Sequence, residues 1–282
     1  GAILHANSDF NVFIGDTAGD ATMTADADKN VGVGYAALGG LTEGDKNIAI
    51  GYQALLSNTE GGNNVVVGMV AGDANLTGDS NVWIGRAAGG ATTDVDSTVC
   101  IGRDAGGGNL TSAADGTIAI GRTALATHTT GARNMAIGHA AMADTDHHAN
   151  TLASIDNTFI GYTAGGGTWE NNDSNYNVGI GNYSMDAAMN GALKNTAVGY
   201  GSLGAVLGAD YNVAIGYDAG NDIQTGSDNV IIGHQAGDKS ADVDKAVIIG
   251  SDSCGAIMTS AADGTVAIWY KAGAAITSGI KN

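Results

Sequence analysis

The sequence lacks proline and has little charge and few aromatic side chains. Of its 282 residues, 14% are charged and 5% are aromatic, whereas a globular domain typically has about a quarter of its residues charged. Glycine is abundant, with 46 residues, and the 44% hydrophobic content is carried mainly by Ala, Val and Ile. This composition argues against a thick core packed by helices. It favours a narrow core of small and β-branched residues with many turns.

Positive charge is also scarce. The chain has 11 Lys and Arg residues against 29 Asp and Glu residues, which gives a formal net charge of −18. Such a balance repels phosphate backbones and anionic lipid surfaces, so we expect neither nucleic acid nor membrane as a partner. No apolar run approaches the roughly 18 residues of a transmembrane helix, so membrane insertion is not predicted.

The main feature of the sequence is a short repeat: Asn, apolar, any residue, Ile or Val, Gly, two variable residues, then Ala or Ser. The anchoring glycines begin at Gly15 and Gly34 and run to Gly250, and a fifteenth copy has Trp269 in the glycine position. Eight of the fourteen intervals between anchors are 17 residues long. A period of 17 is too short for two helices and fits one coil of a parallel β-solenoid, with two strands of about five residues and two tight turns.

Each position that recurs from one repeat to the next predicts a structural role. The glycine marks a corner at which positive φ or close packing excludes a Cβ atom. The Asn that begins each copy predicts a ladder of side-chain hydrogen bonds between neighbouring coils. The Asp that often stands two residues before this Asn, as in Asp45 and Asp79, is typical of turns.

Strand alternation puts the Val/Ile pair of each copy on one face and the residue between them on the other, and we interpret the Val/Ile pair as pointing into the coil. This middle column is apolar, and a continuous apolar stripe on a surface indicates an interface. We therefore predict a homotrimer interface formed by Phe13, Ala49, Val66, Trp83, Cys100, Ala136, Phe159, Ala214, Ile231 and Ile248. The alternative is that this column faces a broader core.

The phrase Asn-x-Ala-Ile-Gly-x-x-Ala resembles the shaft repeats of bacteriophage tail fibres, in which copies ending Ala-Gly and Ala-Leu intermix, as they do here at Ala71-Gly72 and Ala54-Leu55. It is also similar to the head repeats of trimeric autotransporter adhesins. The resemblance implies three chains side by side, each a left-handed parallel β-roll. The expected fold is thus an all-β parallel β-solenoid of about 15 coils over residues 1–270, followed by a lead-out to a tip or further domain at 271–282.

Two long intervals between anchors predict loops, which in solenoids often lie on a binding face. The candidate receptor-binding residues, suited to contacts with sugars, are His147, His148, Trp169, Asn171, Asn172 and Tyr176. The competing interpretation is that these loops are tolerated bulges packed on the solenoid.

Metal binding and catalysis have little support in the sequence. The pairs Asp26/Asp28, Asp94/Asp96 and Asp242/Asp244 offer two carboxylates each, fewer than the six to eight oxygens that calcium takes, so calcium is only an alternative to turn formation. No cofactor, metal site or catalytic residue is predicted, although acids on adjacent coils leave glycoside cleavage open. Cys100 and Cys254 lie about eight coils apart, roughly 38 Å in a solenoid, so a disulfide between them is not expected.

The sequence therefore predicts a non-enzymatic structural or adhesive fibre segment outside cells. The first expectation is a phage tail-fibre shaft whose loops bind a host surface glycan or protein. The head of a bacterial trimeric surface adhesin is the alternative. A second alternative is an ice-binding β-solenoid, for which an exposed threonine array is the expected signature.

Overall fold

The computed structural model describes residues 10–145, 154–170 and 172–278, and these residues form an all-β parallel solenoid, as predicted. The chain divides into two compact units, Gly1–Asn134 and Met135–Asn282. The described strands of the first unit are β1 (Val12–Ile14), β2 (Val31–Val33), β3 (Ile48–Ile50), β4 (Val65–Val67), β5 (Val82–Ile84), β6 (Val99–Ile101) and β7 (Ile118–Ile120). Those of the second are β8 (Met135–Ile137), β9 (Thr158–Ile160), β10 (Val178–Ile180), β11 (Thr196–Val198), β12 (Val213–Ile215), β13 (Val230–Ile232), β14 (Val247–Ile249) and β15 (Val266–Ile268). Two short 3-10 helices, η1 (Ser112–Ala114) and η2 (Ser260–Ala262), lie in the longer coils.

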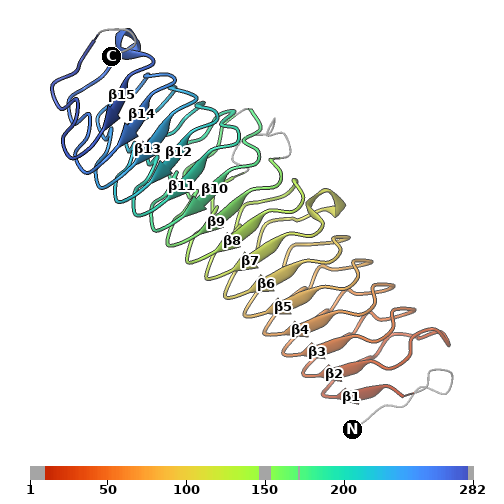
Figure 1. Cartoon of the computed structure of the whole chain (residues 1–282). Helices are drawn as coiled ribbons and strands as arrows, with labels where there is room; N and C mark the ends of the chain where they lie inside the picture. The colour runs from red at the N-terminus through yellow and green to blue at the C-terminus, as the bar shows by residue number, and fades with distance from the viewer. Residues whose placement is uncertain (1–9, 146–153, 171, 279–282) are drawn as a thin grey trace. The chain divides into compact units, whose positions relative to one another are not determined.

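Within each unit the strands pair in chain order, parallel and in register, so that equivalent repeat positions stack (Figure 1). Val31 pairs with Ile48 and Val33 with Ile50, for example. Each described coil has one strand of three residues, whereas two strands of about five residues were predicted. The rest of the coil is turns, because positions such as Lys46 and Gln53 adopt φ values of 57° and 54° that end an extended segment.

The anchoring glycine stands where no side chain fits, as predicted. Gly51 has φ +145°, and a Cβ atom built on it would lie 2.2 Å from the carbonyl oxygen of Gly68 in the next coil. The same clash recurs along the column. Trp269 has φ 131° at this position and is 77% exposed. Its coil is the last of the repeat, so no further repeat carbonyl lies against it.

The predicted asparagine ladder is present in both units. The Asn47 side chain accepts a hydrogen bond through Oδ1 from the Asn64 backbone N–H at 3.0 Å and donates through Nδ2 to the Gly61 carbonyl at 2.7 Å. The Asn64 Oδ1 accepts the Asn81 backbone N–H in the same way, and the side chains of Asn47, Asn64 and Asn81 are fully buried. Each amide thus satisfies backbone groups of the adjoining turns, which a buried turn requires.

Truncating one rung of this ladder is expected to destabilise the first unit. Asn64→Ala removes the acceptor of the buried Asn81 N–H and should cost about 2 kcal/mol of unfolding free energy. Asn64→Thr should cost less, because Thr98 already occupies the equivalent position and donates to the Asn81 Oδ1 at 2.6 Å. Guanidinium denaturation of both variants checks this, and equal losses would contradict a hydrogen-bonding role.

The prediction for the direction of the strand side chains was wrong. The middle residue of every described strand is buried, while its Val or Ile neighbours are exposed or half-buried. The predicted interface residues therefore lie in the core of their own coil, each at most 2% exposed: Phe13, Ala49, Val66, Trp83, Cys100, Ala136, Phe159, Ala214, Ile231 and Ile248. The alternative interpretation, that this column faces a core, is the correct one.

The buried column packs against the residue four positions after the anchor, and in most coils one of the two is large where the other is small. Where the middle residue is Trp83, this later position is Gly89, and a Cβ atom there would lie 2.6 Å from the indole ring. Where the middle residue is Ala49, the later position is the fully buried Leu55. In most coils the mixture of Ala-Gly and Ala-Leu copies is thus a size match within a narrow core. Ala214 with Gly220 is an exception, and there Leu203 and Ile231 of the neighbouring coils lie against the glycine.

Both cysteines are free and buried. Burial raises the pKa of Cys100 to about 12, which makes it an inert core residue. Near the C-terminus, Cys254 N–H donates to the Ala272 carbonyl at 2.9 Å, and Thr259 N–H donates to that of Thr277. Residues 272–277 therefore still follow the coil, within the segment that was predicted as a lead-out.

Candidate interaction surface

The outer face of the strands is apolar in each unit. Its two columns are the first and third residues of every strand, and they contain only Val, Ile, Met and Thr. Ile48, Ile50 and Ile215 are 38–41% exposed, and the terminal strands expose more, with Ile14 at 56% and Ile268 at 57%. With strands about 4.8 Å apart, eight strands and two columns present roughly 400 Å² of uncharged surface. The largest apolar patch of a soluble protein is typically about 300–600 Å² and is often functional, so this face is a candidate interaction site.

Polar side chains border this face. The position before each ladder Asn is a turn residue with positive φ, and it is often charged, as in Lys29, Lys46 and Lys194. On the other side, Arg86 and Arg103 contact the Asp104 carboxylate at 3.4 Å and 3.1 Å. An apolar stripe with a polar rim is the usual arrangement of a protein–protein interface.

In the second unit an aromatic stack runs along one border of the apolar face. Its six rings are contributed by successive coils, with centroid separations of 5.1–5.4 Å: His139, Tyr162, Tyr183, Tyr200, Tyr217 and His234. Burial raises the pKa of Tyr183, and its tyrosine neighbours and Asp186 add to the effect. Because the rings contact one another, mainly their edges and hydroxyls are open to a partner, which suits a polar rim better than a sugar platform.

The structure separates the predicted receptor-binding residues. Trp169 is 1% exposed, packs edge-to-face on Phe159 at 5.9 Å, and donates from Nε1 to the Gly165 carbonyl. It belongs to the core, so its prediction as a binding residue was wrong. Asn172 is exposed and donates from Nδ2 to the Asn190 Oδ1 at 2.7 Å, and Tyr176 is 49% exposed on a turn. His147, His148 and Asn171 lie outside the described residues.

The Asp positions predicted as turn residues form a second ladder. The Asp96 carboxylate accepts the Asp79 N–H at 2.7 Å, and the Asp244 carboxylate accepts the Ser227 N–H at 2.7 Å. These acceptors point toward the preceding coil, whereas the Asn side chains accept from the following one. Among the described residues, no three His, Cys, Asp or Glu side chains gather as metal ligands. The second Asp of two of the Asp-x-Asp pairs, Asp96 and Asp244, thus has a structural role as the acceptor of a turn N–H.

The ice-binding alternative calls for exposed threonines, and the first unit has a partial column of them on its turns. Thr42 and Thr59 are half-buried, and each donates from Oγ1 to a carbonyl of the next coil at 3.1 Å. Leu76 interrupts the column at the following coil. A single interrupted column with engaged hydroxyls is a poor match to a flat threonine array.

Comparison with known proteins assigns the chain to no family. No family model matches the sequence, and no curated protein matches it. In the part of the chain that the structure describes, no helix is long and apolar enough to cross a membrane.

Proposed function

We propose that the chain is a non-enzymatic structural and adhesive fibre segment that acts outside cells as a homotrimer. Its copies associate side by side through the apolar outer face of the strands. The phage tail-fibre shaft is the favoured setting and the head of a bacterial trimeric adhesin the alternative, on the strength of the repeat's resemblance to both. A host or environmental surface glycan or protein is the expected partner.

The exposed Val/Ile columns carry this proposal. A chain with net charge −18 nonetheless keeps the two outer strand columns free of charge throughout the described residues. If these side chains faced water, polar strand formers such as Thr would be tolerated throughout the two columns, because the side chains point away from the core. Their uniform apolar character is explained if a partner covers them.

A second copy of this chain is the occupant that fits this face. The surface repeats with the rise of one strand, about 4.8 Å, and a partner must present apolar side chains at the same interval to interdigitate. Another copy, aligned in parallel, has this interval along its whole length. The polar rim then remains outside the contact, where it can display binding groups.

Several observations favour a structural over a catalytic role. The buried amides are engaged in the ladder, Asp carboxylates such as Asp96 and Asp244 accept backbone N–H groups, and both thiols lie in the core. A fibre works through reach, stiffness and the joint action of several weak contacts, and for this the repeated coil is sufficient.

The oligomeric state tests the proposal. Light scattering of the purified protein should give three times the chain mass of 27.9 kDa. The double variant Val213→Glu/Ile215→Glu should give a folded monomer, because both side chains point away from the core and carboxylates in a closed interface cost several kcal/mol. Thr225→Glu, an exposed turn residue of the same coil, is the matched control and should stay trimeric. A monomeric parent protein would refute the trimer, and a trimeric double variant would refute this face as its seam.

A further inference from the structure

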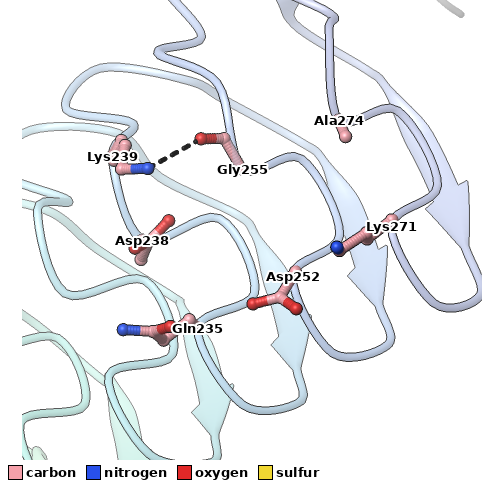
Figure 2. A pocket seen from close by; sticks show the side chains of 7 residues that line it. All are labelled: Gln235, Asp238, Lys239, Asp252, Gly255, Lys271 and Ala274. Atoms are coloured by element: carbon pink, nitrogen blue, oxygen red, sulfur yellow. Dashed lines mark hydrogen bonds between the residues drawn. The ribbon is translucent and has the colours of Figure 1, made fainter.

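A cleft of about 430 Å³ lies on the turns of the second unit. Figure 2 shows side chains from three successive coils around it. The lining residues are Gln235, Asp238, Lys239, Asp252, Gly255, Lys271 and Ala274. The volume lies within the range of small-ligand sites, and it would hold one or two sugar rings.

The cleft arises from the repeat itself. Most of its lining occupies two repeat positions, two and five residues after the anchor, as in Gln235 and Asp238 after Gly233. The same two positions line a cleft of about 290 Å³ in the first unit, where they include Val70, Asp73 and Asp104. A shallow track of constant geometry therefore recurs on the turns, and the residue types decide its chemistry at each place.

The lining of the second-unit cleft differs sharply from the rest of the chain in charge. It combines two carboxylates with two ammonium groups, so its formal charges cancel in a protein of net charge −18. Two of the chain's 11 basic residues thus lie in one cleft. The first-unit cleft has two carboxylates and no basic residue in its lining.

The charged groups of the cleft have partners close by. Lys239 donates from Nζ to the Gly255 carbonyl at 3.1 Å, and the Lys271 Nζ lies 5.0 Å from the centre of the Tyr270 ring. The Asp252 carboxylate lies 3.9 Å from the His234 ring nitrogen, at the end of the aromatic stack. Burial raises the pKa of Asp238, and Asp222 and Asp218 nearby act in the same direction despite Lys239. Donors and acceptors thus line the same cleft, with the carboxylates half-buried and the lysines exposed.

We propose that this cleft binds a unit of a neutral polysaccharide, whose chain follows the track across successive coils. Adjacent hydroxyls of a sugar ring offer both donors and acceptors, which match carboxylate acceptors, ammonium donors and the Gln235 amide. A polyanion or a polycation would gain nothing from a lining whose charges cancel, and an apolar ligand would leave these groups unpaired. This inference rests on the fibre function proposed above and names the class of ligand that the fibre binds.

Binding should be measured by titration calorimetry and saturation-transfer NMR with defined hexasaccharides. The neutral probes are malto-, cello-, manno- and chitohexaose, with oligogalacturonate as the anionic probe and oligochitosan, which carries free amines, as the cationic one. We expect at least one neutral hexasaccharide to bind the parent protein, more tightly than either charged probe. The double variant Gln235→Ala/Asp252→Ala should weaken that binding at least tenfold.

The repeat provides matched variants that keep the fold. Ala36 and Ala87 already occupy the position of Gln235 and Asp252 in other coils with the same positive φ, so alanine is compatible with the turn. Asp104→Ala, at the same repeat position in the first unit, is the control and should leave binding unchanged. No binding by any neutral probe, stronger binding of a charged one, or an unaffected double variant would overturn the proposal. The mass measurement is independent: a trimer that binds no sugar refutes the cleft alone, and a sugar-binding monomer refutes the trimer alone.

Discussion

Gly216→Ala is expected to prevent the second unit from folding stably. Gly216 has φ +139°, and a Cβ atom on it would lie 2.4 Å from the Gly233 carbonyl oxygen, a backbone atom that cannot move without separating two coils. An L-residue in this conformation costs about 1–3 kcal/mol before any clash is counted. The separation of hydrogen-bonded coils adds to this, so we expect a loss above about 4 kcal/mol, which is exceptional for one methyl group. Thermal unfolding followed by circular dichroism measures the effect.

Two further variants show whether the cause is the close approach of coils. Gly255→Ala adds the same methyl group at a glycine whose Cβ atom would only reach the Asp252 carbonyl at 3.4 Å, and it should change stability little. Trp269→Gly changes the one anchor of the repeat that has a side chain, and it should be neutral or stabilising because it relieves a φ of 131°. Comparable losses in Gly216→Ala and Gly255→Ala would contradict this explanation.

Repetition made the turns and ladders predictable from one sequence. Glycine recurs in a column only if every coil excludes a side chain there, and the 2.2 Å approach at Gly51 is the reason. Asn recurs before the strands because each side-chain amide bonds two backbone groups of the following coil, as Asn47 does with Gly61 and Asn64. A column that is constant over many coils reports a requirement of the backbone, and such requirements are local.

The direction of the strand side chains was not predictable by the same reasoning. Alternation assigns Val65 and Val67 to one face and Val66 to the other, but all three are apolar, so hydrophobicity does not say which face is inside. The discriminating signal is size. Residues that pack in one coil must together fill a constant width, and the middle column varies inversely with the position four after the anchor, as Trp83 with Gly89 shows. The outer columns show no such pairing.

The candidate binding residues were harder to predict for a related reason. Trp169 stands among Gly and Asn residues, which suggested an exposed loop, yet the loop returns the indole to the core beside Phe159. The cleft around Gln235 and Asp252 had no motif to reveal it, since its members are 17 or 19 residues apart on neighbouring coils. The repeat period brings them together, and only the turn geometry shows that a hollow lies between them.

The size match in the core predicts that one substitution will destabilise the parent protein but stabilise a variant in which its packing partner is truncated. Trp83→Ala empties a fully buried site against Gly72 and Gly89 and should cost about 3–5 kcal/mol of unfolding free energy. Gly89→Leu alone should also destabilise the first unit, because its side chain would start 2.6 Å from the indole ring. In the Trp83→Ala background, Gly89→Leu should instead recover about 1–2 kcal/mol by refilling part of the cavity.

The double variant converts this coil from the Ala-Gly type to the Ala-Leu type. The chain already uses the Ala-Leu type in the coil where Ala49 is the middle strand residue and Leu55 packs against it. The backbone of the converted coil is suited to the change, since Leu55 has φ 50° and Gly89 has φ 59°. Guanidinium denaturation of the parent, both single variants and the double variant, at one protein concentration, gives the coupling energy between the two sites. A coupling near zero would mean that the two columns do not share a space, and that the mixture of Ala-Gly and Ala-Leu copies has another cause. A stabilising coupling of several kcal/mol would establish that the narrow core, coil by coil, selects which of the two copies can occur.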